Sequence, residues 1–221
     1  DPRTLFPDNE ATLEAAGEIR PWVYDWLTNY QRFGVAFSAE MPGASLWWAG
    51  GSGKTAAATC WALYKPGPVL VVTKAAVRTQ FAREMSKLAD VRPYVLRPPS
   101  SFKSKRKRDA YPSLAEYLKR CHEEGARPVV VVGWPALPRH VDDLCMSLAP
   151  TSIVWDELHT GKGWKRSQGV LQPNGKTKYV PLKNVVASVE AGAVALHGSW
   201  SQSSVDEILG LFEAQAGEGA D

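Results

Sequence analysis

The feature that most constrains the fold is a repeated pattern in which short apolar runs alternate with helical segments. The runs VLVVT (69–73), VVVVGW (129–134) and SIVWDE (152–157) have no polar alternation, which is typical of strands buried on both faces. An amphipathic helical pattern lies between the first two, at 75–88. Strands that alternate with helices predict right-handed crossovers. We therefore expect an α/β fold with a mainly parallel sheet that is flanked by helices on both faces.

The remaining elements follow from the same patterns and from turn and capping residues. Ser113 and Glu116 form the sequence signature of a capping box, and Gly125 can end the helix that they begin. Asn174-Gly175 is a hairpin turn signal, so we expect a β-hairpin or ordered loop over 161–184. Further strands are expected at 46–49, 94–97 and 193–198, and further helices at 54–64, 140–148, 182–190 and from 204.

A glycine-rich loop, GGSGKT, lies between an apolar run and a helical run. Glycines let the backbone turn its N–H groups toward a phosphate chain at a helix N-terminus. In such a loop the lysine reaches the β- and γ-phosphates and the threonine hydroxyl binds Mg²⁺. The phosphate-binding pattern G-x-x-x-x-G-K-[ST] is met except at its first glycine, where Trp48 stands. The expected nucleotide contacts are Gly50, Gly51, Ser52, Gly53, Lys54 and Thr55.

Two carboxylates follow the apolar run that ends at Trp155. A nucleoside triphosphatase needs a carboxylate at a strand end to hold Mg²⁺ and a group that orients the attacking water. We assign these roles to Asp156 and Glu157, with His159 placed to couple the γ-phosphate site to neighbouring segments. Both the glycine loop and the acidic pair come after strands, and parallel sheets bind ligands at the carboxyl ends of their strands. The sequence therefore predicts one site for ATP and Mg²⁺.

Composition narrows the class of protein only slightly. The formal net charge of +3 does not by itself call for nucleic acid, and the three cysteines lack the spacing of a metal site or a disulfide framework. No apolar run is long enough for a membrane span, and no signal peptide is visible. We therefore expect no membrane partner and a cytoplasmic or nuclear protein that is not secreted. The chain begins with Asp, which leaves open whether it is a fragment.

The ordered motifs resemble those of superfamily 2 helicases and translocases, nearest to the SWI/SNF-like (DExH) branch. The similarity lies in the first RecA-like lobe, which binds ATP, and runs from about residue 20 to 213. The segments that carry it are LTNYQRFGVAF (27–37), AGGSGKT (49–55), PVLVVTKAAVRTQFAREM (68–85), VVVVGWPAL (129–137), DELH (156–159) and ALHGSWSQSSVDEILGLF (195–212). This chain departs from the family at Lys74, where proline is usual, and at Gly163, where asparagine is usual. It also departs at His197, Ser199 and Trp200 in the third motif.

The resemblance implies roles for further residues. Gln31 matches the glutamine that reads the adenine edge, and Gly198 and Ser199 match the motif that couples hydrolysis to movement. The residues that match or neighbour segments where the family holds nucleic acid are Lys74, Arg78, Lys162, Lys165 and Arg166. The basic run at 103–108 is either another DNA contact or a solvated loop. By this reading, 1–20 is an N-terminal extension, 21–213 is the lobe with an insertion at 161–184, and 214–221 is a tail or linker start.

The implied function is that of the ATP-binding lobe of a nucleic-acid-dependent ATPase that acts on DNA. Superfamily 2 motors carry arginine fingers on a second RecA-like lobe, and nothing after Phe212 resembles that lobe. Efficient hydrolysis is then expected to need a second lobe, either from a missing C-terminal part or from a separate protein. Two alternatives stay open: a non-motor module that binds DNA or a helicase, and another P-loop enzyme such as a kinase.

Overall fold

The computed structural model describes residues 18–39, 43–98, 101–158, 165–171, 177–184 and 192–197. Its centre is a six-stranded sheet with the order β1-β8-β5-β2-β4-β3, in which every neighbouring pair is parallel. The strands are β1 (Gly43–Trp47), β2 (Val69–Thr73), β3 (Tyr94–Val95), β4 (Val129–Gly133), β5 (Ser152–Asp156) and β8 (Gly192–His197). The predicted α/β fold with a parallel sheet is confirmed.

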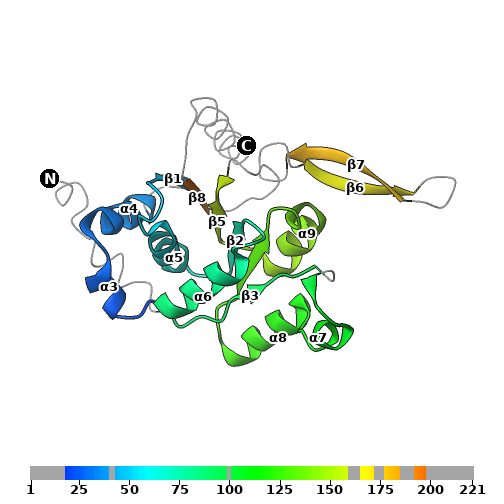
Figure 1. Cartoon of the computed structure of the whole chain (residues 1–221), viewed down its shortest axis with the longest axis horizontal. Coiled ribbons are helices and arrows are strands. Elements are labelled where there is room, and N and C mark those ends of the chain that lie inside the picture. The colour runs from blue at the N-terminus through cyan, green and yellow to red at the C-terminus, as the bar shows by residue number, and fades with distance from the viewer. Residues whose placement is uncertain are drawn as a thin grey trace.

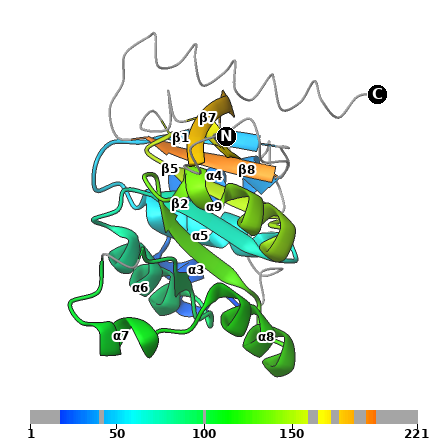
Figure 2. The ribbon, with the colours of Figure 1, turned by 90° about the vertical axis from the view of Figure 1, so that its right-hand side faces the viewer.

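Helices cover both faces of this sheet. They are α3 (Trp22–Trp26), α4 (Asn29–Ala39), α5 (Lys54–Tyr64), α6 (Arg78–Leu88), α7 (Lys105–Asp109), α8 (Leu114–Glu124), α9 (Leu137–Asp143) and the π-helix η2 (Leu144–Leu148). Figure 1 shows α4, α5 and α6 on one side of the central strands and α9 on the other. Figure 2 shows the same layers after a quarter turn.

Alternate side chains of the buried strands feed two separate cores. On β2, Val69 and Val71 pack with residues of α3, α4, α5 and α6, whereas Leu70 and Val72 pack with residues of α8, α9 and η2. All five residues of β2 and of β4 are buried. The absence of polar alternation in these runs thus reflects a sheet that is buried on both faces.

Helix α5 packs directly against the sheet because much of its surface is alanine. Ala57, Ala58 and Ala62 are fully buried, and the buried Trp61 donates a hydrogen bond from Nε1 to the Ser38 carbonyl over 2.8 Å. Helix α8 begins with the predicted capping box of Ser113 and Glu116 and ends at Gly125. The packing of the buried alanines and the hydrogen bond of Trp61 fix the position of α5 and so of the loop that precedes it.

Several boundaries differ from the sequence prediction, among them that of the strand expected at 94–97, which is only Tyr94–Val95. Strand β1 ends at Trp47, so Trp48 belongs to the loop and not to the strand. Helix α9 begins at Leu137 rather than at 140, because a proline at its first turn favours helix initiation there. The helix expected at 182–190 is wrong for 182–184, where the chain is extended and pairs with a neighbouring strand. The rest of that expected helix, and the one expected from 204, lie outside the described residues.

A two-stranded antiparallel sheet stands apart from the main sheet. It consists of β6 (Lys165–Leu171) and β7 (Thr177–Asn184), which pair as the Asn-Gly signal predicted. In Figure 1 this pair extends away from the layered body. Among the described residues, no helix is both long and apolar enough to cross a membrane.

Candidate nucleotide-binding site

The loop between β1 and α5 has a backbone conformation that favours glycine. Gly51 has φ 74° and Gly53, the N-cap of α5, has φ 79°, both in the left-handed region. A Cβ atom built on Gly50 or Gly51 would meet nothing within 4 Å, whereas one on Gly53 would collide with the side chain of Gln31. The loop is therefore open at Gly50 and Gly51, whereas the side chain of Gln31 packs against it at Gly53.

The start of α5 presents hydrogen-bond donors that the chain does not use. Four backbone N–H groups donate no hydrogen bond within the described parts of the chain: those of Gly51, Gly53, Lys54 and Thr55. The Ser52 hydroxyl is also buried without a partner there. Free N–H groups at a helix N-terminus attract anions, because the helix dipole adds to their partial positive charge. This arrangement suits a chain of phosphates.

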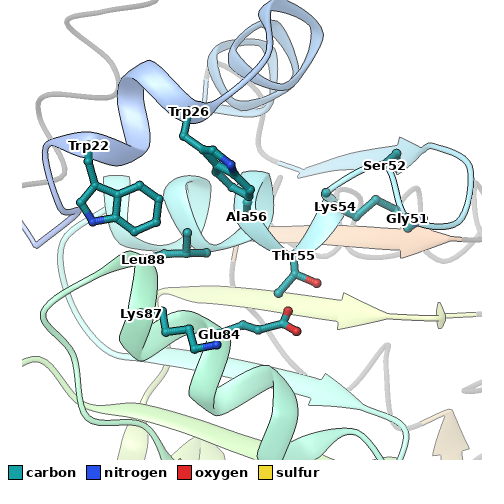
Figure 3. A pocket seen from close by; sticks show the side chains of 11 residues that line it. Trp22, Trp26, Gly51, Ser52, Lys54, Thr55, Ala56, Glu84, Lys87 and Leu88 are labelled. Atoms are coloured by element: carbon teal, nitrogen blue, oxygen red, sulfur yellow. The ribbon is translucent and has the colours of Figure 1, made fainter.

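Lys54 lies across the loop. Its Nζ donates hydrogen bonds to the carbonyl oxygens of Trp48, over 2.7 Å, and Ala49, over 2.9 Å. Figure 3 shows its side chain directed back toward Gly51 rather than along α5. The ammonium group is thus held at the loop, where the unused backbone donors also lie, and one of its three protons remains for another acceptor.

Gln31 and Tyr30 of α4 support the loop from behind. Gln31 is 6% exposed, its Nε2 donates to the Ser52 carbonyl over 2.8 Å, and its Oε1 accepts from the Thr28 N–H over 2.8 Å. The Tyr30 hydroxyl donates to the same Ser52 carbonyl over 2.6 Å. Both ends of the Gln31 amide are therefore engaged within the chain in this structure. The adenine contact that the resemblance implies stays a prediction, beside this contact with the loop.

The Asp156 carboxylate lies at the carboxyl end of β5. Burial is the main cause that raises its pKa, opposed by a hydrogen bond from the Thr73 hydroxyl and by the charges of Lys74 and Lys54. Its backbone carbonyl accepts a hydrogen bond from Nε1 of Trp134 over 2.9 Å. No ion pair of Asp156 occurs among the described residues. A partly buried carboxylate without an ion-pair partner is a suitable oxygen donor for a hard divalent ion.

Glu157 has an unusual backbone for a residue other than glycine. Its φ is 56°, in the left-handed region, and non-glycine residues held there are concentrated at functional sites. Its Oε2 lies 3.9 Å from Nζ of Lys74, which follows β2. Two residues with different predicted roles, Glu157 for the attacking water and Lys74 for nucleic acid, are thus neighbours.

A cavity of about 430 Å³ continues from the glycine loop along α5. Trp22 and Trp26 of α3 line one side, and Glu84 and Lys87 of α6 line the other. In Figure 3 the ring of Trp26 lies beside Ala56 of α5. The indoles are 49% and 56% exposed and contact each other edge to face, with ring centroids 6.0 Å apart. The cavity therefore joins a phosphate-binding loop to an aromatic wall.

These two tryptophans are not among the site residues that the sequence predicts. They lie on a five-residue helix that precedes the first recognised motif. Their only sequence signal is a pair of large aromatic residues four positions apart, which places both on one face of a helix.

The predicted nucleic-acid candidates are only partly within the described structure. Arg78 is the first residue of α6, and its Nη1 donates to the Leu96 carbonyl over 2.8 Å. Its Cδ would lie 3.2 Å from a Cβ built on Gly133, at the end of β4. Lys165 and Arg166 begin β6. Four predicted residues lie outside the described residues: His159, Lys162, Gly198 and Ser199.

Comparisons with solved structures place the fold among helicase domains. The helicase domain of Hef from Pyrococcus furiosus matches with a TM-score of 0.58 and 18% identity, over 89% of this chain and 38% of that one. The UvsW helicase from bacteriophage T4 matches with a TM-score of 0.51 and 17% identity, over 83% of this chain and 56% of that one. No protein-family model and no curated protein sequence matches this chain.

These similarities define the fold as a RecA-like helicase lobe. The chain spans well under two thirds of either helicase chain, 38% and 56%. The activities of those whole proteins can therefore only be proposed for this chain.

Proposed function

We propose that this chain is the ATP-binding lobe of a nucleic-acid-dependent ATPase, a DNA helicase or translocase of superfamily 2 and of its SWI/SNF-like branch. One observation carries the proposal above the others. The unused backbone donors at the start of α5, the Lys54 ammonium and the partly buried Asp156 carboxylate all lie at the carboxyl edge of one parallel sheet, where such sheets bind ligands.

The site residues fit a nucleoside triphosphate with Mg²⁺. The N–H groups of Gly51, Gly53 and Thr55 would bind phosphate oxygens, and Lys54 would exchange its carbonyl partners for the outer phosphates. Thr55 and Asp156 would hold Mg²⁺, whose bound charge would neutralise the phosphate oxygens. The Lys54 charge is close enough to lower the pKa of Asp156, which fits a single site shared by both residues.

Glu157 would orient and polarise the attacking water. A carboxylate in this role has to lie beside the metal-binding residue without being a ligand itself. Glu157 directly follows Asp156, and its left-handed backbone turns the chain at the end of β5. The neighbouring Lys74 holds a positive charge 3.9 Å from its carboxylate.

The nucleoside would occupy the cavity along α5. An exposed indole provides a face on which a purine ring can stack. Trp26 is the better placed of the two tryptophans, because it lies beside Ala56 at the end of the cavity nearest the glycine loop (Figure 3). Gln31 is close enough to this loop to read the base if it releases one of its present partners.

A second RecA-like lobe would complete the motor. In other nucleotide hydrolases an arginine finger accelerates hydrolysis by about 10³–10⁵. The described site contains Lys54 but no arginine among the residues that line the cavity. The chain alone should therefore bind ATP and hydrolyse it slowly, with the second lobe supplied in cis or in trans.

The ATPase rate of this chain, measured with and without DNA, tests the proposal. We expect a low rate that DNA raises little, and a further loss in the Lys54→Ala variant. Addition of a separately encoded second lobe, where one exists, should raise the rate of the wild type and not that of the variant. Rapid DNA-stimulated turnover by the chain alone would contradict the need for a second lobe. Unchanged activity in Lys54→Ala would contradict the site.

A further inference from the structure

The chain that joins β3 to α8 is strongly basic. Between residues 97 and 110 it carries six basic residues and one acidic residue, Asp109. We call the basic ones the basic segment: Arg97, Lys103, Lys105, Arg106, Lys107 and Arg108. The next helix, α8, has mixed charge and includes an exposed Lys119–Glu123 pair at 3.7 Å. The excess of positive charge therefore belongs to this connection rather than to the whole surface.

The basic segment is fixed to the body of the lobe rather than being a loose loop. The Ser104 hydroxyl caps α7 by accepting a hydrogen bond from the Lys107 N–H over 3.3 Å. The aromatic rings on either side of α7, Phe102 and Tyr111, are 5.3 Å apart. The Tyr111 hydroxyl donates to the Val95 carbonyl of β3 over 2.7 Å. The side chains of α7 thus project from an anchored turn of helix.

Most charges on α7 lack an acidic partner. All five of its residues are exposed, and the one ion pair that α7 makes within the described structure joins Arg108 to Asp109 over 3.2 Å. Lys105, Arg106 and Lys107 make none there. The large apolar residues that are exposed in the described structure lie elsewhere in the chain. This surface therefore offers charge without an apolar contact area, which suits a polyanion better than a folded protein partner.

Arg97 connects α7 to a predicted DNA contact. Its guanidinium lies 5.4 Å from the ring centre of Tyr111, and its Nη2 donates to the Thr79 hydroxyl over 3.4 Å. Arg78 is close by, since its Nη1 donates over 2.8 Å to the carbonyl of Leu96, the residue that precedes Arg97. Burial and then the charge of Arg97 lower the pKa of Arg78. No carboxylate forms an ion pair with either arginine among the described residues. Two neighbouring guanidinium groups without an acid repel each other, and a phosphate between them would relieve that repulsion.

We propose that the basic segment is a DNA-backbone-binding surface that continues the track of Lys74 and Arg78 beyond β3. In Figure 1 and Figure 2, α7 lies at the end of the lobe opposite β1, so the track would run across the sheet toward its β3 edge. This inference rests on the proposed function, because it extends the nucleic-acid surface of that motor lobe. The contacts would be made to phosphate oxygens, so binding would depend on salt and not on base sequence.

The test is DNA binding by the 221-residue chain, measured as the fluorescence anisotropy of labelled DNA over a series of salt concentrations. The probes are a labelled duplex and one of its single strands. The Lys105→Gln/Lys107→Gln variant removes two unpaired charges, and Lys119→Gln/Arg120→Gln removes two exposed charges from α8 as a matched control. We expect the α7 variant to bind about five- to tenfold more weakly. The salt slope should fall by about two, one for each lost phosphate contact.

The control should bind as the wild type does, and Lys105→Arg/Lys107→Arg should keep wild-type affinity because it keeps both charges. Each variant is checked by its melting temperature, and equal melting temperatures exclude misfolding as the cause of a loss. An α7 variant that binds as tightly as the wild type would overturn the inference and leave the proposed function intact. A wild-type chain that binds neither DNA probe would instead contradict the DNA-dependent part of the proposed function. Polyglutamate that displaces the labelled DNA as effectively as unlabelled DNA does would indicate an acidic protein partner and overturn the DNA assignment.

Discussion

The side-chain amide of Gln31 donates a hydrogen bond to the backbone carbonyl of Ser52 over 2.8 Å. This contact joins α4, which precedes the first strand along the chain, to the loop that would bind the phosphates. The Tyr30 hydroxyl donates to the same carbonyl, so two adjacent residues of α4 hold one point of the loop. The position of the loop is therefore set by α4 as well as by β1 and α5.

The Gln31→Glu variant should weaken the binding of ATP. The substitution replaces a buried donor with a carboxylate that would face the Ser52 carbonyl, and an unpaired buried acceptor costs about 1–3 kcal/mol. We expect roughly tenfold weaker binding of ATP and of inorganic triphosphate alike, measured by calorimetry. Gln31→Met, which removes the donor without adding charge, should have a smaller effect. A loss confined to ATP would contradict the loop-supporting role and favour base reading alone.

The Gly34→Ala variant should destabilise the fold. A Cβ at Gly34 would come 2.8 Å from Cη2 of Trp48, whose ring also packs edge to face with Tyr30 at 5.1 Å. Overpacking of this kind costs about 1–3 kcal/mol, which exceeds the gain of helix propensity from alanine. Gly50→Ala is the control, because a Cβ there meets nothing within 4 Å. Denaturant unfolding that shows Gly34→Ala to be as stable as the control would refute the packing argument.

The sequence predicted the elements whose pattern is dictated by burial. The strands at 69–73, 129–134 and 152–157 appear as β2, β4 and β5 within one residue, because a sheet buried on both faces admits only apolar residues. The capping box at Ser113 was equally predictable, since its two hydrogen bonds involve residues three positions apart. The glycine loop and Asp156 meet at one sheet edge as expected, because parallel strands place their carboxyl ends together.

Features that depend on long-range packing could not be predicted in this way. The placement of β8 between β1 and β5 is set by the assembled sheet, since no local pattern encodes a neighbour more than 140 residues away along the chain. The family resemblance predicts Gln31 as a site residue, but its bond to Ser52 depends on how α4 packs on α5. The sequence does not distinguish the tryptophans of α3 from other aromatic residues, because only the fold places them beside the loop.

The Trp26→Ala variant should bind ATP more weakly while its affinity for inorganic triphosphate stays the same. Trp26 lines the cavity but is 56% exposed, so its removal should affect the nucleoside and not the phosphates or the fold. Stacking of a base on an aromatic side chain contributes about 1–3 kcal/mol, so we expect roughly five- to a hundredfold weaker binding of ATP. Quenching of tryptophan fluorescence on addition of ATP to the wild type, and less quenching in the variant, is the accompanying signal. Equal loss for triphosphate would contradict the assignment.

The Asp156→Asn variant should be more stable than the wild type and lose Mg²⁺-dependent nucleotide binding. Burial disfavours the charged form of Asp156, as its raised pKa reflects, and asparagine removes the charge while its carbonyl can still accept from Thr73. We expect the melting temperature to rise by on the order of a few degrees. Calorimetry with ATP should show binding that no longer responds to Mg²⁺. A lower melting temperature would indicate that the carboxylate stabilises the fold, which the account does not predict.

The most direct test of the account is calorimetric titration of the 221-residue chain with ATP and Mg²⁺, in parallel with its Lys54→Ala variant. The hydrogen bonds that Lys54 makes within the described residues go to two carbonyls of its own loop, so its replacement should leave the fold unchanged while removing the charge that the phosphates need. We expect the wild-type chain to bind one ATP, dependent on Mg²⁺, and the folded variant to show no measurable binding. Equal binding by the two chains, or none by the wild type, would contradict the claim that this lobe is built to bind ATP.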